Sequence, residues 1–93
     1  MTSCSVAIAN RLGLHARAAA KFVHLATRFK SQIRVARDHR VIDGKSIMGI
    51  LLLAAPCGAA ITISAEGPDE VEAIAELCKL VESGFGENQT WNA

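Results

Sequence analysis

Apolar and polar residues alternate along four short stretches of this chain, which is the pattern of β-strands that bury one face. The first stretch, residues 5–9, places Val6 and Ile8 on the same side. A turn of two polar residues separates the second stretch from the third, so these two are expected to form a hairpin. The last three stretches cover residues 32–37, 40–43 and 59–67.

Two helices are predicted from the segments between these strands. Residues 16–29 repeat apolar side chains at the spacing of an amphipathic helix. Ser46 can cap a second, short helix with the body IMGILLL, which Pro56 and Gly58 end. The apolar face of the first helix is Ala19, Phe22, Val23, Ala26 and Phe29.

A third helix is predicted near the end of the chain. Pro68 fits its first turn, and Asp69 and Glu70 place negative charge at the positive end of the helix dipole. Gly84 stands where a glycine commonly ends a helix. The expected buried stripe is Val71, Ile74, Leu77, Cys78 and Val81.

The element order is therefore β-α-β-β-α-β-α in a single domain covering residues 1–93, with residues 86–93 expected to be a frayed tail. Four strands with one apolar face each need cover on one side only. The predicted fold class is α+β. We expect an open-faced two-layer β-sandwich, in which a four-stranded antiparallel sheet is covered on one side by three helices.

Composition and charge exclude several classes of partner. Hydrophobic residues make up 51% of the chain, which favours a globular core, and the formal net charge is +1. Such a charge gives no reason to expect binding to nucleic acid or to an anionic membrane. Residues 46–65 carry no charge, but Pro56 and Gly58 interrupt them, so we expect no membrane insertion. No signal peptide is visible at the start of the sequence.

The cysteines predict neither a disulfide framework nor a metal site. Cys4, Cys57 and Cys78 are odd in number and far apart, so we interpret them as free thiols in a reducing cytoplasm. They form no CxxC or HxxxH spacing with His24 and His39, two histidines that we expect to be solvated. No metal and no cofactor is expected.

The segment GLHARAAAKFV places His15 at the entry to the first helix. The first amides of a helix have no acceptors within it, and with the positive charge of Arg17 they make a site for an anion of phosphate size. A neutral imidazole beside such a site is a nucleophile suited to transient phosphorylation. By local features alone, the same residues also fit an ordinary helix cap with a solvated arginine.

Three motifs carry a resemblance over residues 5–87. LGLHARAAAKFV, KSIMGILLL and ITISAEGPDE together resemble the histidine-containing phosphocarrier (HPr) family of the phosphoenolpyruvate-dependent phosphotransferase system. The resemblance implies that Nδ1 of His15 accepts a phosphoryl group from enzyme I and passes it to an enzyme IIA domain. It also implies a carrier rather than an enzyme, in a cytoplasmic protein that we expect to be monomeric. The residues expected to hold the phosphate are Ala16, Arg17 and Ala18.

One departure from the family pattern concerns Ala18, where the family usually has proline. Alanine allows the same helix geometry less rigidly, so the site is expected to survive. Two branches of the family fit the sequence. The SGF stretch at 83–85 favours a nitrogen-related regulatory branch without a role in sugar transport, whereas KSIMG favours the sugar-transport or kinase-controlled members.

The sequence of the second helix predicts a regulatory site and a surface that docks partner proteins. Its capping residue, Ser46, matches the serine that HPr kinase/phosphorylase modifies in many bacteria, so the resemblance implies possible regulatory phosphorylation. Ile47, Met48 and Leu51 are expected to leave an apolar patch at the surface that docks enzyme I and enzyme IIA.

The rival from a different class is a small α+β binding module of the ferredoxin-like kind, carrying a metal ion or RNA. Such a module would need CxxC ligands or aromatic residues on its central strands. The sequence has neither pattern, and it contains no tyrosine.

Overall fold

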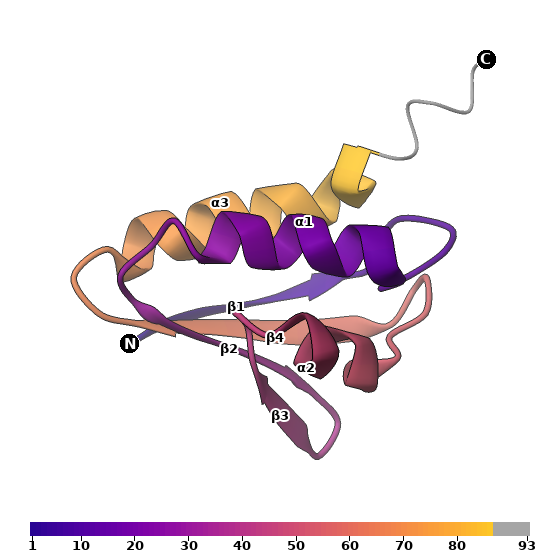
Figure 1. The fold of residues 1–93 in the computed structure, drawn as a ribbon, viewed down its shortest axis with the longest axis horizontal. Coiled ribbons are helices and arrows are strands. Elements are labelled where there is room, and N and C mark those ends of the chain that lie inside the picture. Colours follow the sequence, from indigo (N-terminus) through magenta and orange to yellow (C-terminus); the bar gives the residue numbers. More distant parts are fainter. Residues whose placement is uncertain (87–93) are drawn as a thin grey trace.

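The computed structural model describes residues 1–86, and the predicted order of elements is confirmed within them (Figure 1). Residues 87–93, which make up most of the predicted tail, lie outside the described part. The elements are β1 (Thr2–Ala7), α1 (Ala16–Ala26), β2 (Gln32–Arg37), β3 (Arg40–Asp43), α2 (Ile47–Leu53), β4 (Ala60–Glu66) and α3 (Glu70–Glu82).

The strands of residues 1–86 form one antiparallel sheet in the order β1-β4-β2-β3. Helices α1 and α3 lie side by side along one face of this sheet, and α2 packs against α1 and against β2 and β3 (Figure 1). The pairing register aligns one inward row across the whole sheet, and the next row faces away from the helices. The inward row is Cys4, Ile63, Val35 and Ile42. The outward row is Ser5, Thr62, Ala36 and Val41.

Burial follows this alternation and confirms the open-faced sandwich. Ile63 and Val35 are fully buried between the sheet and the helices, whereas Val41 on the outer row is 63% exposed. On the open face the hydroxyls of Ser5 and Thr62 are hydrogen-bonded to each other at 3.2 Å. The core on the helix side is therefore closed by aliphatic side chains, and the other face of the sheet carries a mixture of polar and apolar ones.

The bounds of four elements differ from the prediction. Strand β1 covers residues 2–7 rather than 5–9, although Ile8 is still buried and donates its amide to Ala59 O at 2.8 Å. Helix α1 ends at Ala26 rather than at residue 29, where Thr27 caps it and donates its hydroxyl to His24 O. Strand β4 is one residue shorter at each end, and α3 begins after Pro68 rather than including it. The predicted body of α2, IMGILLL, is confirmed.

The predicted buried stripe of α3 is wrong at one position. Val71 is 71% exposed, while Ala73 is fully buried. The helix begins at Glu70, and the face that it turns toward the sheet passes through Ala73, Ile74 and Leu77. Val71 is apolar but lies off that face. Packing, and not hydrophobicity, therefore decided that this side chain is exposed.

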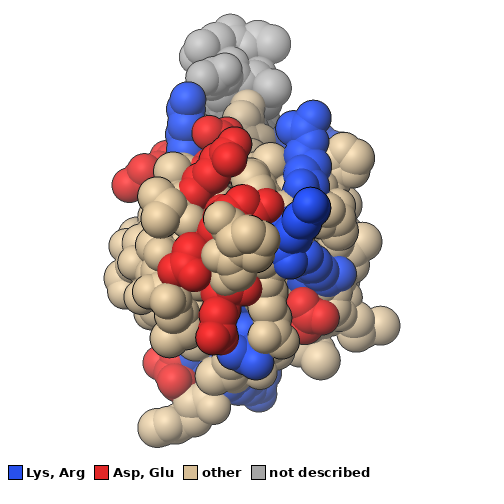
Figure 2. Space-filling model, turned by 90° about the vertical axis from the view of Figure 1, so that its left-hand side faces the viewer, with Lys and Arg blue, Asp and Glu red and all other residues tan. Residues whose placement is uncertain are grey.

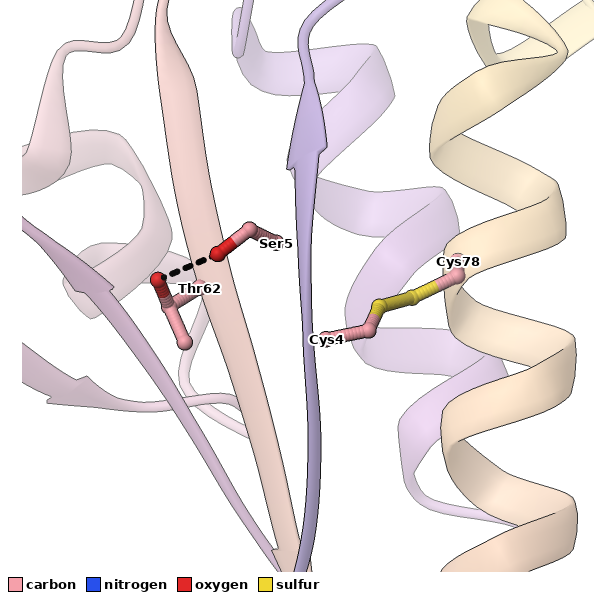
Figure 3. The surroundings of a disulfide bond; sticks show 4 residues. All are labelled: Cys4, Ser5, Thr62 and Cys78. Atoms are coloured by element: carbon pink, nitrogen blue, oxygen red, sulfur yellow. Dashed lines mark hydrogen bonds between the residues drawn. A yellow bond between two sulfur atoms is a disulfide. The ribbon is translucent and has the colours of Figure 1, made fainter.

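The prediction of three free thiols is wrong for two of them. Cys4 in β1 and Cys78 in α3 form a disulfide, with their Cα atoms 7.3 Å apart (Figure 3), and only Cys57 is free and exposed among the described residues. The two partners are 74 residues apart in sequence, so their spacing gave no sign of the pairing. They meet because the inward row of the sheet places Cys4 directly below α3. The bond joins an edge strand to the helix that covers it.

Asp69 connects the start of α3 to the loop that follows α1. Its carboxylate accepts hydrogen bonds from the hydroxyl and the amide of Ser31 and from the amide of Lys30. These donors, the Ser31 hydroxyl foremost, lower the pKa of Asp69 from 3.8 to about 2. The Asp69 carboxylate, which was predicted to complement the dipole of α3, therefore also connects the start of α3 to the loop after α1.

This lowered pKa predicts a loss of stability in acid. The unfolded chain binds a proton at Asp69 more readily than the folded protein does, so the contribution is complete above pH 4 and disappears as the pH falls from about 4 to about 2. We expect urea denaturation at several pH values to show a fall in the free energy of unfolding across this window. The fall should be smaller in Asp69→Asn, and an identical pH profile in Asp69→Asn and the wild type would contradict the prediction.

Candidate functional site

His15 caps the N-terminus of α1, as predicted. Its backbone is extended (φ −82°, ψ 179°), and its carbonyl accepts the first intrahelical bond, from the amide of Ala19 at 2.8 Å. Nδ1 of the imidazole accepts the amide of Arg17 at 3.3 Å. This distance is long for such a bond, so Nδ1 is directed at the first amides of the helix while its lone pair is only weakly engaged. The ring is half-buried.

The loop before His15 is held by backbone contacts with the segment after α2. The amide of Leu14 donates to Ala55 O at 3.0 Å, and Leu14 itself is buried. The carbonyl of Gly13 accepts both the His15 amide at 2.9 Å and Nδ2 of the fully buried Asn10 at 2.7 Å. Asn10 was missed in the sequence, where an asparagine in a polar loop carries no signal of burial.

The predicted phosphate-binding residues form the first turn of α1. Ala16 and Arg17 are exposed, and Ala18 is fully buried. No acidic residue lies in this turn, so nothing on the helix itself opposes an anion at its start. The methyl group of Ala18 packs into the hydrophobic core.

Carboxylates gather at the other end of the molecule. Figure 2 shows that end, where α3 begins, with acidic side chains in a stripe beside a column of basic ones. The two carboxyl groups with clearly lowered pKa values, those of Asp69 and Glu70, lie there. For Glu70 the main cause is a hydrogen bond from the Thr2 hydroxyl.

The second helix presents part of the predicted docking patch. Ile47 is 45% exposed and Met48 is 68% exposed, whereas Leu51 is half-buried and packs against the core. Two exposed apolar residues were missed: Leu52, which is 58% exposed, and Leu12 in the loop before His15, which is 68% exposed. The i, i+4 spacing of Met48 and Leu52 is the signal that could have identified Leu52.

Ser46 caps α2 as predicted. Its hydroxyl oxygen accepts the amide of Gly49 at 3.1 Å, from an extended backbone. The residue is half-buried and lies next to the exposed Ile47. A charge added to this hydroxyl would therefore stand at the edge of the apolar patch.

Residues 1–86 offer neither a membrane-crossing helix nor a cluster of metal ligands. No helix there is long and apolar enough to cross a membrane. No three His, Cys, Asp or Glu side chains in this part of the chain come together as a possible metal site.

The fold and the site define a small open-faced sandwich protein that presents one histidine at the start of a helix. A family model described as "PTS HPr component phosphorylation site" matches residues 2–83. The chain is 49% identical over 82 residues to a phosphocarrier protein HPr of Cupriavidus necator, covering 88% of this chain and 92% of that protein. It is 44% identical over 89 residues to the HPr of Neisseria meningitidis serogroup A, covering 96% of this chain and all of that protein.

Solved structures agree with these matches. The crystal structure of HPr-C-His from Thermoanaerobacter tengcongensis superposes with a TM-score of 0.89 at 49% identity, covering 92% of this chain and 97% of that one. The chain therefore belongs to the HPr family of phosphocarrier proteins of the phosphotransferase system.

Proposed function

We propose that this protein relays a phosphoryl group from enzyme I, which takes it from phosphoenolpyruvate, to an enzyme IIA domain. Nδ1 of His15 attacks the phosphorus atom, a new N–P bond forms, and the bond to enzyme I breaks. The same N–P bond breaks when the group moves to the acceptor, so the protein ends each cycle unchanged and turns over no small molecule by itself. The observation that carries the proposal is the position of Nδ1, 3.3 Å from the Arg17 amide at the start of α1.

The first turn of α1 supports this role electrostatically. A phosphoryl group on Nδ1 would lie next to the first amides of the helix, which have no acceptors within it and favour negative charge. The exposed guanidinium of Arg17 can donate to its oxygens or to acidic groups of a partner. Ala16 and Ala18 contribute through their backbone amides only.

Docking is proposed at the apolar side chains near this site. Ile47 and Met48 are exposed on α2, which packs against α1, the helix that His15 caps. Leu51, on the same helix, is half-buried and packs against the core. Such a patch lets enzyme I and enzyme IIA use one surface in turn. The proposal places the protein in the cytoplasm as a monomer. Strand β1 is held by its pairing with β4 as well as by Cys4–Cys78, so the site does not depend on a bond that a reducing compartment would open.

The test is phosphorylation in a defined mixture. We expect the wild-type protein to gain one phosphoryl group, seen by intact mass, when it is incubated with enzyme I and phosphoenolpyruvate. The group should be lost in mild acid, since N–P bonds hydrolyse there and serine esters do not. Adding enzyme IIA domains of the sugar-transport and the nitrogen-related kind, in separate reactions, should remove it, and the faster acceptor assigns the branch. A protein that gains no phosphoryl group, or an acid-stable one, would overturn the proposal.

We also propose that phosphorylation of Ser46, by a kinase of the HPr kinase/phosphorylase type, regulates docking. A phosphoserine would add nearly two negative charges beside Ile47, which would repel an acidic partner. We expect Ser46→Asp to slow phosphorylation of His15 by enzyme I about tenfold, a size typical of one repulsive charge at an interface. Ser46→Asn is the matched control, because it caps the helix equally well without charge. Equal rates for the two variants would show that charge at this position does not regulate transfer.

A further inference from the structure

The hairpin between β2 and β3 places two arginines directly opposite each other. Arg37 and Arg40 are paired in the register, on either side of a turn in which Asp38 adopts a left-handed φ of 56°. Like charges in directly opposite positions destabilise a strand pair. Such a pair therefore calls for an interaction that offsets the repulsion.

Both guanidinium groups bind the end of α2. Nη1 of Arg40 donates to Leu52 O at 2.6 Å, and Nη1 of Arg37 donates to Leu53 O at 2.9 Å and to Ala54 O at 3.4 Å. Helix α2 is only seven residues long and has no basic residue in its own last turn. The hairpin thus supplies the positive charge that favours a helix C-terminus, from a part of the chain twelve or more residues away.

These contacts add to the packing of α2 against β2 and β3. A surface pocket of about 310 Å³, lined by the turn residues and by Leu53 and Ala54, lies beside them. Leu53 is itself buried in the core, so the guanidinium groups bind the backbone at the end of a helix whose apolar side is already packed. One of the carbonyls that Arg37 contacts belongs to Ala54, which has a left-handed φ of 50°, unfavourable for an L-residue other than glycine.

The residue after Ala54 is the one that holds the loop of His15. The buried Ala55 accepts the Leu14 amide through its carbonyl at 3.0 Å, and the same oxygen lies against Gly13. A continuous set of contacts therefore runs from Arg37 and Arg40 through the end of α2 to the backbone that enters α1. We propose that Arg37 and Arg40 are positioning residues for His15.

This inference rests on the proposed function for its kinetic readout only. In the double variant Arg37→Met/Arg40→Met, we expect hydrogen exchange at the Leu14 amide to be about tenfold faster than in the wild type, a change matching the loss of two exposed charge-assisted contacts. Exchange at the Ile63 amide, in the central strand β4, should stay within twofold. With enzyme I and phosphoenolpyruvate, kcat for phosphorylation of His15 should fall about tenfold while KM changes by less than twofold, because neither arginine touches the reacting atoms or the exposed side chains at the start of α2.

Two matched variants complete the test. Arg34→Met removes an exposed arginine from the outward row of the same strand and should change neither readout. Arg37→Lys/Arg40→Lys keeps a donor at each position and should restore most of the Leu14 protection. Should the double methionine variant not fold, Arg40→Met alone should accelerate Leu14 exchange about threefold, the share of one such contact.

Some results would overturn the inference. One is Leu14 exchange unchanged in the folded double variant. Another is a higher KM at unchanged kcat, which would make the arginines docking residues. Failure of the proposed function itself is distinguishable, since a wild-type protein that enzyme I does not phosphorylate would still show the effect on Leu14 exchange.

Discussion

A His15→Asn variant is expected to gain no phosphoryl group from enzyme I and phosphoenolpyruvate, under conditions that label the wild-type protein completely. Asparagine removes the nucleophilic ring nitrogen but remains a good N-cap, so α1 should still begin at Ala16. Intact mass measures the label, and thermal unfolding should show a folded protein with a free energy of unfolding within about 1 kcal/mol of the wild type.

His24→Asn is the control for this experiment. His24 is an exposed histidine in the last turn of the same helix, at the opposite end from His15, and its variant should be labelled as fully as the wild type. Label that persists in His15→Asn and disappears in His24→Asn would assign the chemistry to the wrong histidine. Label that persists in both would mean that neither accepts the group.

Gly13→Ala is expected to have the largest effect on stability among substitutions near the site. Gly13 has a φ of +67°, and a Cβ there would lie 2.5 Å from Ala55 O and 2.9 Å from Pro56 Cα. Both are backbone atoms, so no rotation of a side chain relieves the clash, and the loop before His15 must move. We expect a loss of about 3 kcal/mol in the free energy of unfolding, from left-handed strain and overpacking together.

Gly58→Ala separates the two causes. Gly58 also has a positive φ, +90°, but a Cβ there would meet nothing within 4 Å. Its variant should lose only about 1 kcal/mol, the cost of the backbone conformation. Urea denaturation of both variants measures the difference, and phosphorylation by enzyme I should be slowed in Gly13→Ala only. Equal losses of stability would show that the approach of Gly13 to Ala55 does not constrain the loop.

The elements of this fold were predictable wherever one local rule was sufficient. Alternation placed β2 and β3 at their observed bounds, and a single capping residue, Ser46, located the start of α2. The end of α1 was not predictable in the same way. Apolar spacing continues to Phe29 although the helix stops at Ala26, because Phe29 packs against the core from outside the helix.

The residues of the candidate site were also predictable only where a local rule was sufficient. His15, Arg17 and Ser46 were found because helix starts have local signatures and because the motifs resemble a known family. Asn10 and the pair Arg37 and Arg40 were not found, since their partners are backbone carbonyl groups, in the same loop for Asn10 and at the end of α2 for the arginines. A hydrogen bond to a backbone carbonyl cannot be predicted from the type of the accepting residue, because every residue carries a backbone carbonyl.

The sequence by itself determined which residues form strands and helices, which face of each is apolar, and that a histidine stands at the start of α1. These are properties of neighbouring residues, and the periods of strand and helix express them directly. Only the tertiary structure decided that Cys4 meets Cys78, that Val71 is exposed, and that a distant hairpin binds the end of α2. Those outcomes depend on strand order and register, which bring together residues that no local pattern relates.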